Sequence, residues 1–227
     1  MRFRHHPAPV PAVPVSGGGS FPVRRIFCVG RNYAEHVREM GGDPTREAPF
    51  FFTNPADDVL TGGTDMPYPP GTADLHHEME LVAAIGSGGS HIKPGDALGH
   101  VYGYAAGLDM TRRDLQSEAK KAGRPWDMSK GFDFSAPIGE IVPASRIGHP
   151  ARGGIELKVN GKIRQSSDLN RMIWSVAETV AYLSGLVRLA PGDLIFTGTP
   201  EGVAAVRRGD LLEGVVESIG SVRTRIA

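Results

Sequence analysis

The chain has 227 residues, and its 25 Lys and Arg balance 25 Asp and Glu, so the formal net charge at pH 7 is zero. It contains no block of like charge and no apolar run long enough to span a bilayer, which argues against a nucleic-acid or membrane partner. The 30 glycines and 18 prolines stand mostly at turn positions, which favours a mixed, β-dominated α+β fold with a few short helices. The single cysteine, Cys28, excludes an internal disulfide and favours a reducing, cytoplasmic location.

The sequence predicts an N-terminal arm followed by one domain. Residues 1–20 are rich in proline and end in SGGGS, which indicates an arm or an edge segment. Residues 21–227 contain no long linker. We therefore expect residues 21–227 to fold as a single domain.

Periodicity and turn residues predict the elements of this domain. Asn160-Gly161 is typical of a two-residue hairpin turn, and two capping-box patterns, Asn32 with Glu35 and Ser175 with Glu178, mark helix starts. Residues 124–150 are expected to form a long loop with one short strand near 137–142. The other expected elements are strands over 23–29, 50–53, 75–85, 101–110, 191–196 and 208–212, a hairpin over 155–164, and helices over 33–40, 111–122 and 175–184.

Two carboxylates share one face of the predicted strand over 75–85. With a period of two, Glu78 and Glu80 fall on one face, and the opposite face is almost entirely apolar. Like charges this close resist joint ionisation unless a cation neutralises them, so the pattern suggests a divalent-metal site. The alternative is a half-exposed strand with a solvated acidic face, and for a Glu-x-Glu pair by itself that alternative is favoured.

A third acid, Asp109, ends the strand over 101–110. The residues that precede it on its face are small, including Gly103, Ala105 and Gly107, which indicates close backbone approach or the floor of a pocket. Oxygen ligands from Glu78, Glu80 and Asp109 would suit Mg²⁺ or Mn²⁺. The spacing does not by itself show that the two strands are neighbours.

A histidine and a glutamate share a face of the predicted helix over 33–40. His36 and Glu39 could act as a general base and the carboxylate that orients it. The alternative is a solvated helix face, which is the commoner outcome for such a pair.

Other polar residues are candidates for binding substrate or stabilising charge. Arg113 and Gln116, on the helix over 111–122, could hold a carboxylate and a carbonyl, and Lys130 could stabilise an oxyanion. Thr199, in the sequence TGTP after a strand, offers a hydroxyl and a backbone N–H. For each of these residues, ordinary helix surface, a solvated lysine or a simple turn is the alternative interpretation.

Taken together these segments resemble the fumarylacetoacetate hydrolase family. The matching segments, in family order, are 28–33 (CVGRNY), 75–81 (LHHEMEL), 107–116 (GLDMTRRDLQ), 158–161 (KVNG), 172–174 (MIW) and 191–200 (PGDLIFTGTP). Three further segments, 21–26 (FPVRRI), 50–53 (FFFT) and 123–127 (GRPWD), most resemble the fumarylpyruvate hydrolases of the gentisate pathway.

The resemblance implies a catalytic domain over 21–227 with a β-sandwich roll, usually as a homodimer. It implies a Mg²⁺ or Mn²⁺ site at Glu78, Glu80 and Asp109, which would bind a small 2-oxo acid. It also implies that His36 and Glu39 lie on a lid that orders over the substrate. Further site residues, for substrate contact or charge stabilisation, are Arg31, Arg113, Gln116, Lys130 and Thr199.

The mechanism implied by the resemblance is hydrolysis of an acylpyruvate. His36, oriented by Glu39, would deprotonate a water that attacks the distal carbonyl, with Lys130 and Gln116 stabilising charge. Carbon–carbon cleavage would release pyruvate enolate, whose charge the metal neutralises, and an acid, which is fumarate if the substrate is fumarylpyruvate.

One departure from the family pattern concerns the distal end of the substrate. Relatives commonly have Lys-Pro where this chain has Asn54-Pro55, so a positive charge near the expected pocket mouth is lost. A shorter acylpyruvate therefore stays open as the substrate. The alternative enzyme activities are oxaloacetate decarboxylation or tautomerisation, and isomerisation or dehydration of a related 2-oxo acid. The non-enzyme alternative is a metal-dependent binding module.

Overall fold

The structure, a computed structural model, describes residues 4, 6 and 8–227. The strands are β1 (Ala12–Pro14), β2 (Ser20–Pro22), β3 (Arg25–Gly30), β4 (Phe50–Asn54), β5 (Val59–Leu60), β6 (Leu75–His76), β7 (Met79–Ile85), β8 (Val101–Leu108), β9 (Thr111–Arg112), β10 (Ala136–Pro137), β11 (Val142–Pro143), β12 (Gly154–Val159), β13 (Lys162–Asp168), β14 (Asp193–Phe196), β15 (Ala205–Val206), β16 (Leu211–Val216) and β17 (Gly220–Arg225). The helices are α1 (Ala34–Glu39), α2 (Arg113–Lys121), α3 (Asp127–Lys130), α4 (Ala144–Ile147) and α5 (Val176–Leu186). Among the described residues, no helix combines the length and apolar character needed to cross a membrane.

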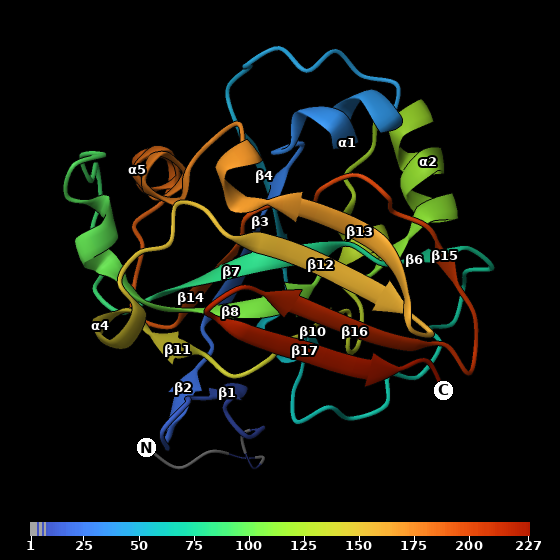
Figure 1. Cartoon of the computed structure of the whole chain (residues 1–227), viewed down its shortest axis with the longest axis horizontal. Helices are drawn as coiled ribbons and strands as arrows, with labels where there is room; N and C mark the ends of the chain where they lie inside the picture. Colours follow the sequence, from blue (N-terminus) through green and yellow to red (C-terminus); the bar gives the residue numbers. More distant parts are fainter. Residues whose placement is uncertain (1–3, 5, 7) are drawn as a thin grey trace.

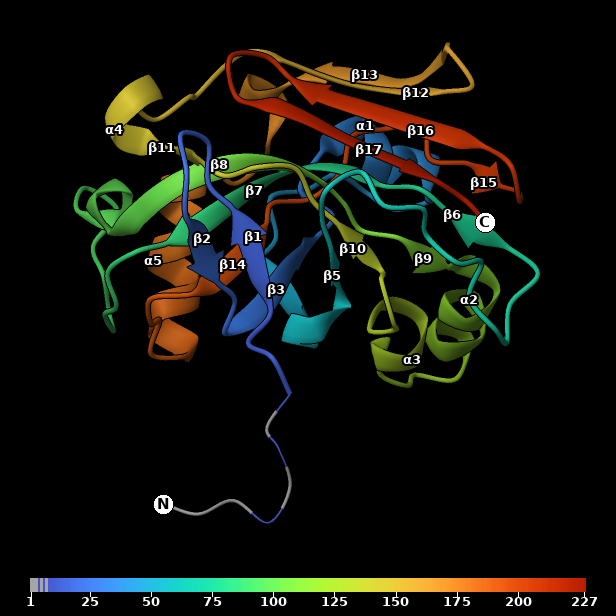
Figure 2. The ribbon, with the colours of Figure 1, turned by 90° about the horizontal axis from the view of Figure 1, so that it is seen from below.

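Two stacked sheets form the body of the molecule. The larger sheet has the strand order β11-β8-β7-β14-β3-β4, and its neighbours are antiparallel except for the parallel pair β14 and β3. The smaller sheet, β13-β12-β16-β17, is antiparallel and lies across one face of the larger sheet (Figures 1 and 2). The predicted strand-dominated sandwich with short helices is therefore confirmed.

The predicted strand over 75–85 is interrupted and is buried on both faces. The chain breaks at His77 and Glu78, so β6 pairs with β15 and β9 while β7 pairs with β8 and β14. Leu81, on one face of β7, points into the main core between the two sheets. Val82, on the other face, joins a second core that the β1–β2 hairpin covers. The alternative of a half-exposed strand with a solvated acidic face is therefore wrong.

The pairing of β7 with β8 brings the three acids together. Glu80 lies opposite Gly107, and the backbone N–H of Asp109 donates to the carbonyl of Glu78 at 2.9 Å. A Cβ atom at Gly107 would lie 2.7 Å from Val82 Cγ2 and 2.8 Å from Phe196 Cε1, so glycine leaves room for these two side chains. The close backbone approach predicted for this face of β8 is confirmed at Gly103, where a Cβ atom would lie 2.4 Å from the carbonyl oxygen of Val142.

One of the two predicted helix caps is wrong. Helix α5 has the capping box of Ser175 and Glu178. Helix α1 instead begins after Tyr33 without a side-chain cap, because the Asn32 amide serves a different purpose. Its Nδ2 donates to the carbonyls of Trp174 and Thr197, and its Oδ1 accepts from Trp174 N.

Two other differences concern residues 124–150 and the C-terminus. The predicted long loop contains the short helices α3 and α4 and the strands β10 and β11. Helix α3 begins after Trp126 without a side-chain cap, so no capping residue in the sequence announces it. Strand β17, which was not predicted, forms the edge of the smaller sheet beside β16.

Gln165, fully buried on β13, ties the smaller sheet to the break before β7. Its Oε1 accepts from the backbone N–H of Met79 at 3.0 Å and lies 3.0 Å from His77 Nδ1. Its Nε2 donates to Thr199 Oγ1 and to the carbonyl of Pro200, each at 2.8 Å. The Gln165 amide therefore holds together two loops that meet at Met79, where β7 starts.

We expect Gln165→Ala to lower the free energy of unfolding by about 3 kcal/mol, because several buried polar groups would lose their partner at once. Urea denaturation measures this change. Arg164→Ala, at the exposed neighbouring position, is the control and should stay within about 0.5 kcal/mol of the wild type. A similarly small change for Gln165→Ala would contradict its role in holding the two loops.

Candidate active site

One pocket gathers nine of the ten predicted site residues, and only Glu39 is outside its lining. Glu80 is on β7, Asp109 directly follows β8, and Lys130 ends the short helix α3. The lining residues are Val29, Gly30, Arg31, His36, Met40, Phe52, Glu78, Glu80, Asp109, Arg113, Gln116, Lys120, Trp126, Lys130 and Thr199. Asn54, expected near the pocket mouth, is not among them.

The three predicted metal ligands form a compact, buried triad. Glu78, Glu80 and Asp109 each offer a carboxylate oxygen, and these atoms lie within 4.8 Å of one another. Glu80 also accepts a hydrogen bond of 2.7 Å from the backbone N–H of Gly198. Residues from two adjacent strands and the loop after β14 therefore converge on one point.

Two buried cations offset part of the negative charge. Lys130 Nζ lies 2.7 Å from both Glu78 Oε2 and Asp109 Oδ2, and Arg113 Nη2 donates to Glu78 Oε1. Burial alone would raise the pKa of Glu78, but Lys130 and Arg113 outweigh burial and hold that pKa well below its usual range. Burial alone would lower the pKa of Lys130, but Asp109 and Glu78 raise it, so Lys130 stays charged.

The other two carboxylates are not fully compensated. Burial and the charges of Asp109 and Glu78 raise the pKa of Glu80 well above its usual range. Burial raises the pKa of Asp109 to about 6 despite its contact with Lys130. Lys130 is shared between Asp109 and Glu78, but Glu78 is also paired with Arg113. Glu78 is therefore the carboxylate whose charged form is stabilised most.

The donor set fits a divalent cation. Three carboxylates and two cations leave one net negative charge when all are ionised. Asp109 Oδ1 is buried and has no hydrogen-bond partner among residues 4, 6 and 8–227. An all-oxygen set of this kind suits Mg²⁺ or Mn²⁺. A cation would favour the charged forms of Glu80 and Asp109 and would satisfy the orphaned oxygen.

His36 lines the pocket, and Glu39, which is outside the lining, contacts its imidazole ring. His36 Nδ1 lies 3.3 Å from Glu39 Oε2, and both carboxylate oxygens of Glu39 accept from Gly202 N, at 3.0 and 3.1 Å. If Nδ1 donates to Glu39, then Nε2 is left as the proton acceptor. Burial lowers the pKa of His36, and Glu78 and Glu39 partly counter that effect.

The predicted substrate-contacting residues already make hydrogen bonds within the protein, which limits the groups that each can offer to a ligand. Arg113 Nη1 donates to Gln116 Oε1 at 2.6 Å, so the Gln116 amide N–H groups are left as donors for a ligand. Thr199 Oγ1 donates to the carbonyl of Met79 at 2.9 Å. Thr199 could therefore contact substrate through its backbone N–H or as an acceptor. His76, close to Glu78 in the chain, does not line the pocket, and its Nε2 lies 2.9 Å from Asp74 Oδ1.

Six lining residues were not among the predicted site residues: Lys120, the aromatic residues Phe52 and Trp126, and Val29, Gly30 and Met40. Lys120 could have been found, because the helical period puts it on the same side of α2 as Arg113 and Gln116. The two aromatic residues carry no comparable signal, because a buried aromatic residue is usually core.

Comparisons with known proteins place the chain in a family. The profile described as fumarylacetoacetate (FAA) hydrolase C-terminal matches residues 25–227. The fumarylpyruvate hydrolase from Pseudomonas aeruginosa, in a crystal structure with Mn²⁺ and pyruvate, is 52% identical, with all of this chain and 99% of that chain covered and a TM-score of 0.98. The chain belongs to the fumarylacetoacetate hydrolase family of enzymes.

Curated relatives include two different activities. A fumarylpyruvate hydrolase from Ralstonia sp. is 47% identical over 79% of this chain and 93% of its own length. The mitochondrial oxaloacetate tautomerase FAHD1 of Rattus norvegicus is 40% identical over 89% of this chain and 91% of its own length. The family and the buried triad together define a metal-dependent enzyme of the hydrolase or isomerase type.

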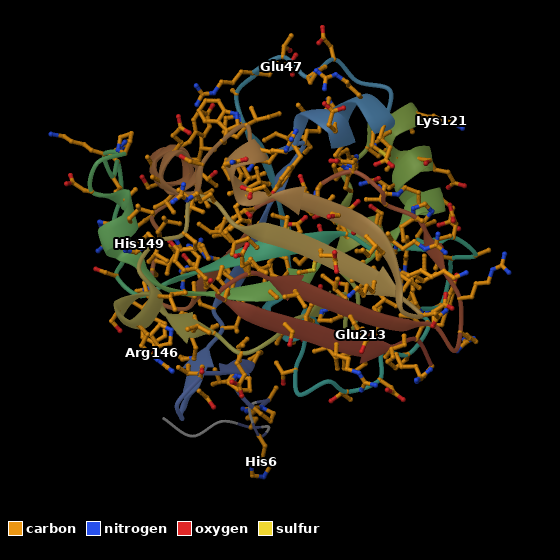
Figure 3. The ribbon with its side chains drawn as sticks, in the orientation of Figure 1. His6, Glu47, Lys121, Arg146, His149 and Glu213 are labelled. Atoms are coloured by element: carbon orange, nitrogen blue, oxygen red, sulfur yellow. The ribbon has the colours of Figure 1, made fainter. Side chains whose placement is uncertain are left out.

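We expect Glu80→Gln to weaken Mn²⁺ binding about 100-fold, because cation affinity in oxygen sites follows the number of charged ligands. Titration calorimetry with MnCl₂ measures the affinity. Glu213→Gln, on β16 of the smaller sheet (Figure 3) and outside the pocket lining, is the control with the same charge change. Wild-type affinity in Glu80→Gln would show that Glu80 is not a ligand.

Proposed function

We propose that the protein is a metal-dependent hydrolase that cleaves the carbon–carbon bond of an acylpyruvate, with fumarylpyruvate as substrate and fumarate and pyruvate as products. The observation that carries the proposal is the presence of a His–Glu pair, a buried lysine and a carboxylate triad in and behind one pocket. The named activities of the Pseudomonas aeruginosa and Ralstonia relatives support the choice of substrate.

The metal would serve the pyruvate end of the substrate. A Mg²⁺ or Mn²⁺ ion held by Glu78, Glu80 and Asp109 would neutralise the negative charge that this end gains as the bond breaks. The ion would also convert the net charge of the cluster from −1 to +1, which favours an anionic 2-oxo acid.

The protein side chains would activate the water and accept its proton. His36 accepts a proton from water through Nε2, and the hydroxide formed adds to the carbonyl carbon that joins the fumaryl arm to the methylene group. The bond between these two carbons then breaks, its electron pair passes to the pyruvate part as an enolate, and the methylene carbon takes up one proton. Lys130 and the Gln116 amide are positioned to stabilise the developing charge.

We expect His36→Ala to lower kcat for fumarylpyruvate cleavage by about 10²–10⁴-fold, because the variant lacks the general base. Loss of the enol absorbance of the substrate measures the rate. Mn²⁺ affinity in the same variant should equal that of the wild type, which separates loss of the base from loss of the metal site. Full hydrolysis by His36→Ala would overturn the water-activating role, and no turnover by wild-type enzyme with Mg²⁺ or Mn²⁺ would overturn the proposed function.

We expect the pH profile of kcat/KM to report His36. The base must be neutral, and burial lowers its pKa, so activity should persist below the ordinary histidine pKa of about 6.5 and fall only at more acidic pH. Glu39 raises this pKa, so Glu39→Gln should move the acid limb to still lower pH while reducing the plateau. An acid limb that does not move in Glu39→Gln would contradict the pairing.

Oxaloacetate tautomerisation is the second candidate, favoured by the similarity to the FAHD1 tautomerases. Proton transfer within a 2-oxo acid enol needs no attacking water, so this reaction could survive His36→Ala. Parallel assays of fumarylpyruvate and oxaloacetate with that variant distinguish the two activities.

A homodimer and a cytoplasmic location stay predictions. Analytical ultracentrifugation tests the oligomeric state.

A further inference from the structure

Two cations at the outer end of the pocket have no carboxylate partner in the part of the chain that the structure describes. Arg31 and Lys120 both line the pocket and are exposed at its rim. No ion pair or side-chain hydrogen bond to either residue occurs among residues 4, 6 and 8–227. The inner cations, in contrast, are tied to the triad. Burial lowers the pKa of Lys120, and the charges of Arg113 and Arg31 lower it further, while Glu78 opposes them.

The backbone at Arg31 adopts an uncommon conformation that holds this residue at the rim. Its φ is 59°, in the left-handed region that costs an arginine about 1–3 kcal/mol. The preceding Gly30 has no room for a side chain, because a Cβ there would lie 2.0 Å from Phe50 Cζ. The Arg31 guanidinium carbon in turn lies 5.9 Å from the centre of the Phe50 ring.

An aromatic wall connects the triad to these outer cations. Phe52 lies 5.1 Å from Lys130 Nζ at the inner end, and its ring centre lies 5.8 Å from that of Trp126. Trp126 in turn lies 5.0 Å from Lys120 Nζ and 5.2 Å from the ring of Phe50. These contacts therefore form a path of aromatic rings from Lys130, beside the triad, to Lys120 and Arg31.

We propose that Arg31 and Lys120 form a carboxylate-binding subsite that selects substrates with a second carboxylate at the far end of a flat acyl arm. The proposal rests on the proposed function for the inner end of the pocket, where the 2-oxo acid would bind. Unpaired cations beside aromatic faces attract a carboxylate strongly, and the rings can pack against a planar conjugated arm.

A kinetic test compares fumarylpyruvate with acetylpyruvate, which lacks the second carboxylate. The double variant Arg31→Gln/Lys120→Gln should lower kcat/KM for fumarylpyruvate about 100-fold, mainly through KM, and leave acetylpyruvate within about 3-fold of the wild-type value. Lys120→Arg should retain most of the preference. Lys121→Gln, which projects outward from α2 (Figure 3), has the same charge change as Lys120→Gln and should leave both substrates unchanged.

A binding test separates this inference from the proposed hydrolysis. 2-Oxopimelate has the chain length of fumarylpyruvate but no second oxo group to be cleaved, and 2-oxoheptanoate differs from it only in lacking the distal carboxylate. With Mn²⁺ present, the wild type should bind 2-oxopimelate at least 10-fold more tightly by titration calorimetry, and the double variant should bind the two ligands equally.

The outcomes of the two tests are distinct. A diacid preference without any acylpyruvate cleavage would overturn the hydrolase proposal and keep the subsite. Equal binding of the two ligands by the wild type would overturn the subsite whatever the activity. Equal losses for fumarylpyruvate and acetylpyruvate in the double variant would also overturn it, since the two cations would then act on the whole pocket.

Discussion

The structure depends on a buried cluster of charges in which three carboxylates outnumber two cations. Charged groups without partners are very costly inside a protein, and removal of one member of a buried pair typically costs about 3–5 kcal/mol. Lys130 contacts both Glu78 and Asp109, and Arg113 also contacts Glu78. The remaining negative charge cannot be met by the side chains around it. This excess of buried negative charge destabilises the folded chain, and for the same reason it makes the site suited to a divalent cation.

Chemical roles are separated along the pocket. The acids lie at its inner end, and the proposed base, His36, lies on the wall where Glu39 supports it. The aromatic residues and the unpaired cations lie farther out. A ligand with a 2-oxo acid at one end and a carboxylate at the other would match this order of charges. If Arg31 and Lys120 bind a carboxylate as proposed, the pocket would prefer a substrate such as fumarylpyruvate, whose second carboxylate is at the far end of its acyl arm.

The loops around the pocket are held by amides and by positions that exclude side chains. Asn32 fixes the chain before α1 to the segments at Trp174 and Thr197, and Gln165 fixes the break before β7. Gly107 leaves room for the side chains of Val82 and Phe196 beside the acid-bearing strands. None of these residues needs to touch a substrate. They act by fixing the positions of the residues that would.

The sequence by itself determined the strand-dominated class, the hairpin turn at Asn160-Gly161, the α5 cap and the identity of the acids, because each depends on local periodicity or local hydrogen bonding. It could not show that Glu80 and Asp109 are neighbours, since that requires the pairing of β7 with β8. It could not show that Lys130 is buried, since that follows from the position of α3 beside the triad. Only the tertiary structure decided which charges meet and which, like Arg31 and Lys120, are left without a partner among the described residues. Burial and distance set the energy of a charge, and both are properties of the folded chain.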